Sequence, residues 1–189
     1  GAAYEDPIRL LAVNTLLDHY VQQGALPALE RMLPLVSQDD LFRYDLGINL
    51  RLLRAGDSYE DEEDYTSASL MFASVLPFGT LRSRVEQQLI ATEETLFTRQ
   101  FAPEEEMALR DLRAALAAER QELLSIPDYT GDLRWRQARV LSRMERRYEA
   151  FFAFRRLLQD FPGHRRIEQF HYSAFIQGIA CNYIDDAIT

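Results

Sequence analysis

Few side chains in this sequence have the types and spacing that catalysis or metal binding requires. The densest group of carboxylates is the acidic run from Glu60 to Asp64, and carboxylate oxygens are ligands that Ca²⁺ prefers. The run lacks the alternating ligand positions and the central glycine of an EF-hand loop. A solvated turn is therefore the favoured interpretation.

The histidines and the cysteine give no better support for a reactive site. His19, His164 and His171 do not stand in an HExxH or Cys/His arrangement, so no zinc site is expected. Cys181 and His171 would lie on one helix about 15 Å apart along its axis, too far for a nucleophile and its base to share a hydrogen bond. The sequence has no Walker loop, GxGxxG fingerprint or GxSxG elbow. We expect no catalytic residue, no cofactor and no metal.

Arginine and tryptophan offer binding chemistry instead. All 21 basic residues are arginines, and Trp135, the only tryptophan, stands among several of them. Tryptophan and arginine are enriched where proteins bind one another. The amphipathic ring can equally cover a helical hairpin from outside, and both interpretations stay open.

Charge and composition exclude several classes of protein. The formal net charge of −9 argues against a general nucleic-acid binder that neutralises phosphates. The charge is uneven: residues 1–126 carry 22 acids and 11 arginines, whereas residues 127–167 carry 5 acids and 10 arginines. No window approaches eighteen uncharged apolar residues, so no membrane span is expected. A single cysteine excludes an internal disulfide and leaves the redox compartment open.

The elements that must position these side chains are helices. Only 8 of the 189 residues are glycine and 7 are proline, while Leu, Ala, Glu, Gln and Arg, all good helix formers, are abundant. A hydrophobic content of 47% supports a sizeable core. We predict an all-α fold.

The stretch from Leu133 to Pro162 organises the prediction. Ala150 is followed by Phe154 and Leu157 at intervals of four and three, which places the three on one helical face. An alanine at that point lets two antiparallel helices approach closely. Pro162 then ends the helix, because it has no backbone donor.

These positions resemble the tetratricopeptide repeat (TPR) family. The same family pattern matches earlier in the chain at Leu52, Gly56, Tyr59, Tyr65, Ala68, Phe72 and Val75. The resemblance implies an α-solenoid of antiparallel hairpins wound as a right-handed superhelix. We expect a single array over residues 1–189, with hairpins at 8–38, 41–78, 81–125 and 131–162 and a partial fifth unit at 165–189.

The register of one small residue supports the array. Ala28, Ala68, Ala108 and Ala150 are separated by 40, 40 and 42 positions, against about 34 in a standard TPR. Ala187 would be the next small position. We expect each alanine to lie where two helices touch.

The stretch 147–172 is also similar to the TPR segments of bacterial cell-envelope proteins. That similarity favours a periplasmic or cell-envelope location and leaves the cytoplasm open. It covers only about one repeat, so it carries no specific function.

In TPR proteins the first helix of each repeat lines a concave groove that binds peptides or partner helices. By register, the resemblance places Asp57, Glu60 and Asp61 in this groove from the second unit, Trp135, Arg139 and Arg143 from the fourth, and Arg166 from the fifth. The two ends of the groove would then carry opposite charge and orient a complementary partner. A solvated helix face with arginines that aid solubility is the alternative.

The function that this implies is a non-catalytic scaffold that binds a protein or peptide on its concave face. A structural spacer within a larger bacterial cell-envelope protein is the second hypothesis, and an enzyme of unrecognised type is the third. The identity of the partner and the oligomeric state are not encoded in any recognisable motif.

Overall fold

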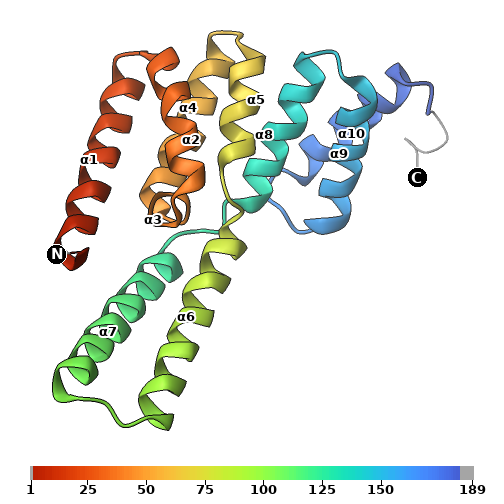
Figure 1. Cartoon of the computed structure of the whole chain (residues 1–189). Coiled ribbons are helices and arrows are strands. Elements are labelled where there is room, and N and C mark those ends of the chain that lie inside the picture. Colours follow the sequence, from red (N-terminus) through yellow and green to blue (C-terminus); the bar gives the residue numbers. More distant parts are fainter. Residues whose placement is uncertain (1, 184–189) are drawn as a thin grey trace. The chain divides into compact units, whose positions relative to one another are not determined.

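The computed structural model describes residues 2–183, without the side chains of residues 2–5 and 26. Every regular element in this range is an α-helix, which confirms the all-α prediction (Figure 1). In chain order the helices are α1 (Ala2–Gln22), α2 (Leu26–Gln38), α3 (Asp40–Arg43), α4 (Leu46–Asp61), α5 (Tyr65–Ser74), α6 (Phe78–Thr98), α7 (Pro103–Ser125), α8 (Thr130–Arg143), α9 (Arg147–Asp160) and α10 (Ile167–Ala180). None of them combines the length and the hydrophobicity that crossing a bilayer requires.

Several helices begin where the sequence supplies a cap. The Asp45 carboxylate accepts a hydrogen bond from the backbone N–H of Ile48 at 2.7 Å at the start of α4. The Asp64 carboxylate does the same for α5, from the N–H of Ser67 at 3.1 Å. Such bonds satisfy N–H groups that have no partner inside the helix. The helix α7 begins at Pro103, with three glutamates in its first turn, where negative charge is favourable.

One kind of turn joins the helices of three antiparallel pairs. It comprises residues 23–25 between α1 and α2, 62–64 between α4 and α5, and 144–146 between α8 and α9. In each turn all three backbone N–H groups donate to carbonyls in the end of the preceding helix. The middle residue, Gly24, Glu63 or Glu145, has a positive φ of 62°, 62° or 58°. This three-residue turn satisfies the last helical carbonyls and reverses the chain.

The chain divides into two compact units, Gly1–Leu76 with Thr130–Thr189, and Pro77–Tyr129. In the larger unit α5 packs directly against α8, and the Gln137 side chain donates to the Phe72 carbonyl at 2.9 Å. The hairpin expected at 81–125 is present as α6 and α7, but it forms the smaller unit. The structure thus has two compact units where a single array was expected.

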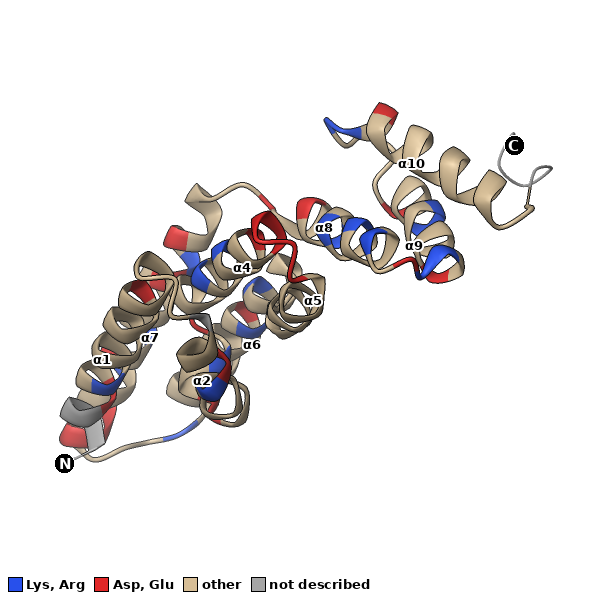
Figure 2. Cartoon of the chain, turned by 90° about the horizontal axis from the view of Figure 1, so that it is seen from above, with Lys and Arg blue, Asp and Glu red and all other residues tan. Residues whose placement is uncertain are grey.

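The larger unit has two rows of helices. Viewed from above, α1, α4, α8 and α10 follow one another on one side, and α2, α5 and α9 follow one another on the other (Figure 2). The pairs α1 and α4, α4 and α5, α8 and α9, and α9 and α10 are in contact. We call the surface carried by α1, α4, α8 and α10 the first-helix face.

Small residues allow the helices of a pair to approach closely. A Cβ atom added to Gly56 of α4 would lie 2.4 Å from the ring of Phe72 in α5, so glycine is required there. In the next pair, Ala138 of α8 is fully buried in one cluster with Ala150 and Phe154 of α9. Gly56, which matches the family pattern, thus lies at a close helix contact whose partner is the Phe72 ring.

The expected alanine register holds at two of the four described positions. Ala68 and Ala150 are completely buried, and each is the fourth residue of the second helix of its pair. In α2 the fourth residue is Leu29, which is also completely buried, so Ala28 is one position out of register. Ala108 is exposed on α7. The near-constant spacing of 40 to 42 residues is therefore a coincidence of helix and loop lengths.

The smaller unit is a pair of long helices, α6 and α7, that pack against each other. Leu116 and Leu123 of α7 are buried, and Arg113 of α7 pairs with Glu93 of α6 at 2.8 Å. Leu112, by contrast, is 48% exposed. Ala108 and Ala115, on the same face of α7, are also exposed. The four-then-three spacing of these three residues gives a helical face, but that face is not packed.

The partial fifth unit expected at 165–189 lies only partly within the described residues. Its first helix is α10, and the expected second helix, with Ala187, falls on residues 184–189, outside the described part of the chain.

Candidate interaction face

The structure places the predicted groove residues on three neighbouring helices of the larger unit. Asp57, Glu60 and Asp61 lie on α4, Trp135, Arg139 and Arg143 on α8, and Arg166 at the start of α10. Glu60, Arg139, Trp135 and Arg166 belong to one connected set of contacts, and Asp57 pairs separately with Arg136. Asp61 and Arg143 are exposed, and within residues 2–183 neither forms an ion pair.

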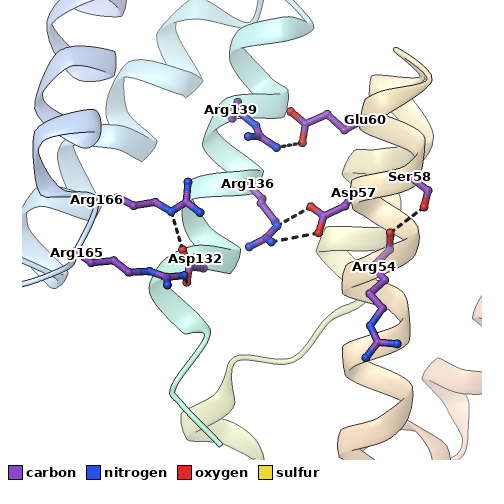
Figure 3. A network of polar contacts seen from close by, with 9 residues as sticks. All are labelled: Arg54, Asp57, Ser58, Glu60, Asp132, Arg136, Arg139, Arg165 and Arg166. Carbon is purple, nitrogen blue, oxygen red and sulfur yellow. Dashed lines mark hydrogen bonds and ion pairs between the residues drawn. The ribbon is translucent and has the colours of Figure 1, made fainter.

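Two ion pairs join α4 to α8 (Figure 3). The Arg136 guanidinium donates to both carboxylate oxygens of Asp57, at 2.6 and 3.1 Å, and Arg139 donates to Glu60. Both pairs join residues 79 positions apart. The two helices therefore run in the same direction, with acids at one spacing facing arginines at the same spacing. Fork-shaped guanidinium groups suit this bidentate geometry.

The expectation that these acids and arginines form opposite ends of a groove is thus corrected. It assumed that a hairpin stands between α5 and α8, and the structure has α5 packed directly on α8. Glu60 and Arg139 therefore neutralise each other. The Glu60 side chain is only 9% exposed, which leaves little of its carboxylate for an outside ligand.

Trp135 lies between the core and the first-helix face. Its ring packs against the cluster that contains Ala138 and Phe170. The guanidinium carbons of Arg139 and Arg166 lie 4.3 and 4.5 Å from its ring centroid, within the range of cation–π attraction. The two roles that the sequence left open, packing and surface recognition, are therefore both compatible with its position.

The carboxylate of Asp132 in α8 lies close to the three basic residues that precede α10. Arg165 donates to its carboxylate at 2.7 Å, Nε of Arg166 lies 3.1 Å away, and Nε2 of His164 lies 3.8 Å away. The Asp132 side chain is 15% exposed. His164 also stacks on the ring of Phe170, with the centroids 4.9 Å apart. His164 thus has a packing role here.

The ion pairs between successive first helices share one polarity. Asp18 of α1 pairs with Arg51 of α4 at 2.6 Å, the acids of α4 pair with the arginines of α8, and Asp132 of α8 pairs with the arginines before α10. In each case the earlier helix supplies the acid and the later one the arginine. Arg136 and Asp132, which the sequence analysis missed, are part of this series. Two pairs of the series could have been found from the sequence. The acids Asp57 and Glu60 are three residues apart, and so are the arginines Arg136 and Arg139 that they contact.

A hollow lies on the first-helix face between α8 and α10. It has a volume of about 430 Å³ and is lined by Trp135, Arg166, Glu168, Gln169, Tyr172 and Ser173. Tyr172 is 69% exposed, so its ring is free to contact a ligand. The hollow joins two aromatic rings to one cation and one anion. Tyr172 was not singled out from the sequence, because an isolated tyrosine on an amphipathic helix gives no distinctive signal.

The acidic run Glu60–Asp64 has structural roles. Glu60 pairs with Arg139, Glu63 is the middle residue of a three-residue turn, and Asp64 caps α5. Across the described residues no three His, Cys, Asp or Glu side chains come together in a way that could hold a metal ion. Glu60 and Asp61 thus end α4, and only residues 62–64 form the turn that was expected over the whole run.

Comparison with protein-family models finds none that matches the chain, and comparison with curated proteins likewise finds no match.

Proposed function

We propose that the larger unit is a TPR-like α-solenoid. Three features support this assignment: helices paired by identical turns, a small buried residue at the same place in α5 and α9, and first helices that follow one another along one face. The family pattern at Gly56, Ala68 and Phe72 coincides with close packing in the structure. A right-handed superhelix is part of the proposal.

The function we propose is that of a non-catalytic scaffold, which binds a peptide or partner helix on the first-helix face. The observation that carries the proposal is the open hollow beside Trp135 and Tyr172. Aromatic rings flanked by arginine are the usual anchors of protein recognition, and the first helices are the groove-forming elements in the family that the chain resembles.

We propose a revised set of residues that contact the ligand. Arg139 is already engaged by Glu60 and Trp135, so its role is to position the Trp135 ring. Tyr172 and Arg143 are exposed and take the place of Arg139 and Glu60 as ligand contacts. Arg166, which lines the hollow, stays in the set. An acidic peptide with one large apolar side chain matches this surface.

The sole tryptophan provides a direct test. Synthetic acidic peptides that contain one phenylalanine or leucine and no tryptophan are titrated into the protein, and Trp135 fluorescence is recorded. Binding should change the emission, and Tyr172→Ala or Arg143→Glu should weaken the affinity about tenfold or more, as expected for contacts at a hot spot.

Arg156→Glu is the matched control for Arg143→Glu, because Arg156 lies on α9, away from the first-helix face, and its side chain is 82% exposed. It should leave the affinity unchanged. Equal affinities for all of these variants would contradict the proposal.

A structural spacer is the second candidate, and the ion-pair series favours it. Asp57, Glu60, Arg136 and Arg139 satisfy one another inside the chain, which is what a segment needs if its faces only stack. The spacer hypothesis predicts that no peptide changes Trp135 emission at any concentration. The same titration therefore separates the two candidates.

A further inference from the structure

We propose that the partner bound on the first-helix face is a second copy of this chain, which inserts the tip of its α6–α7 hairpin into the hollow. The tip comprises residues 94–105, that is, the end of α6, the connecting loop and the first residues of α7. This inference rests on the proposed function, because it names the partner of the same site. The exposure and charge of the tip carry it.

Phe97 is the most prominent feature of the tip. It lies in the last turn of α6, and its side chain is 93% exposed. No other large apolar side chain in the described part of the chain is as exposed. A ring that lies almost wholly in water gains free energy when a partner covers it.

The side chains around Phe97 make the tip acidic. It contains three glutamates and one arginine. Glu94, Glu104 and Glu105 are exposed, and within the described part of the chain none of the three forms an ion pair. Negative charge disfavours contact with an anionic membrane surface. It favours a partner surface that offers basic and aromatic groups.

The hollow between α8 and α10 offers both kinds of group. The rings of Trp135 and Tyr172 and the guanidinium of Arg166 line it, together with the carboxylate of Glu168. Its volume of about 430 Å³ lies in the range of roughly 300–1,000 Å³ that is usual for ligand pockets. Residues 127–167 carry 10 arginines and 5 acids. The tip, an acidic segment with one exposed aromatic ring, therefore has the chemistry that the hollow was proposed to bind.

The hairpin presents its tip far from its own base. Its helices have 21 and 23 residues, so at about 1.5 Å per residue each is about 30–35 Å long. The loop 99–102 joins them at the far end (Figure 1). Buried Leu116 and the ion pair between Arg113 and Glu93 hold the two helices together. The tip is therefore carried on a paired arm that can enter a recess on another molecule.

The contact joins two different surfaces, because each copy carries one tip and one hollow. Two copies can exchange tips and close as a dimer, or successive copies can extend into a chain. In both cases the mean mass rises with protein concentration.

Sedimentation velocity on the full chain tests the proposal. The mean mass should rise with concentration, and Trp135 emission should change over the same range. Phe97→Ala should weaken the association about tenfold or more, as expected for the loss of a hot-spot ring. Ile90→Ala is the matched control, because Ile90 is 56% exposed on the same helix, seven residues before Phe97. It should leave the association unchanged.

Mixing two variants makes the test specific for this contact. Phe97→Ala retains an intact hollow, and Tyr172→Ala retains an intact tip. At one concentration, an equimolar mixture should have a higher mean mass than either variant alone, because only the mixture can form the wild-type contact. A mixture with no higher mass than its components would overturn the proposal. So would equal association of Phe97→Ala and Ile90→Ala, or a wild-type mass that stays constant up to about 1 mM protein.

Failure of this proposal can be distinguished from failure of the proposed function. Phe97→Ala leaves the hollow free, so the synthetic acidic peptides can be titrated into this variant while Trp135 emission is recorded. Peptide binding without self-association would overturn the second-copy proposal alone. Absence of both would overturn the proposed function as well.

Discussion

Arg139 shows how one side chain in this protein can serve several contacts. Its guanidinium pairs with Glu60 on α4 and lies over the Trp135 ring on its own helix. Replacing it would release a nearly buried carboxylate and uncover the ring at once. Loss of binding in an Arg139 variant would therefore not identify a direct ligand contact, whereas loss in a Tyr172 variant would.

Asp18 is the residue whose pKa shift has a testable consequence for stability. The pKa of its carboxyl is lowered, chiefly because Arg51 donates a hydrogen bond to it and despite a smaller opposing effect of burial. A carboxyl with a lowered pKa in the folded state stabilises the fold above its unfolded pKa of about 3.9. That contribution is lost as the pH falls through the folded-state value.

Asp18→Asn should therefore lower the free energy of unfolding near neutral pH and have a shrinking effect below about pH 4. The pair is partly exposed, with side chains 25% and 39% accessible, so solvent screening limits the loss to about 0.2–1 kcal/mol. Urea unfolding at neutral and acid pH measures it. Asp61→Asn removes the same charge from an exposed site without an ion pair and is the control. A difference that grows on acidification would contradict the assignment.

At the scale of elements, helix ends are set locally and helix partners are not. The middle position of the three-residue turn is occupied by residues as different as Gly24, Glu63 and Glu145. Only glycine among them readily adopts a positive φ. The turn is therefore imposed by how two helices meet more than by the preference of one residue.

At the scale of elements, the buried Ala150 and the exposed Ala108 should respond differently to the same substitution. Ala150→Leu adds three carbon atoms to a completely buried position beside Ala138 and Phe154 and should cost about 1–3 kcal/mol through overpacking. Ala108→Leu adds them to an exposed position on α7 and should change stability by no more than about 0.5 kcal/mol.

Urea unfolding measures both variants. Trp135 fluorescence reports on the larger unit, and far-ultraviolet circular dichroism reports on all helices. Equal losses for Ala150→Leu and Ala108→Leu would mean that the two positions are packed alike, and the register described for α9 would then be wrong.

At the scale of the molecule, the main feature is a series of paired helices interrupted in sequence by a separate hairpin. The contacts between α5 and α8 lie within the larger unit and do not involve Pro77–Tyr129. The end of α5 and the start of α8 also lie at the same end of that unit (Figure 1).

Replacing Pro77–Tyr129 by a short glycine–serine linker should therefore leave the larger unit folded. We expect the Trp135 emission and the urea midpoint reported by it to stay close to those of the intact chain, because the Gln137 to Phe72 hydrogen bond and the α4 to α8 ion pairs are retained. An unfolding curve without a cooperative transition would show that the hairpin is needed for folding. So would a loss of helical circular dichroism greater than the removed residues account for.

The sequence by itself determined the all-α class, several helix boundaries and the small positions Gly56, Ala68 and Ala150. Capping residues, prolines and apolar spacing act over a few residues, so they can be read without the fold. The expected Ala108 position failed because periodicity shows which face of a helix is apolar and not whether another helix covers it.

Only the tertiary structure decided which helices are neighbours. The direct packing of α5 on α8 pairs Asp57 with Arg136 and Glu60 with Arg139 across 79 residues of sequence, turning two expected groove ends into one neutralised contact. The packing of α8 and α10 on α9 likewise brings Trp135 and Tyr172 to the same hollow. Contacts of this kind depend on long-range packing, in which residues far apart in sequence become adjacent, and no local pattern specifies that.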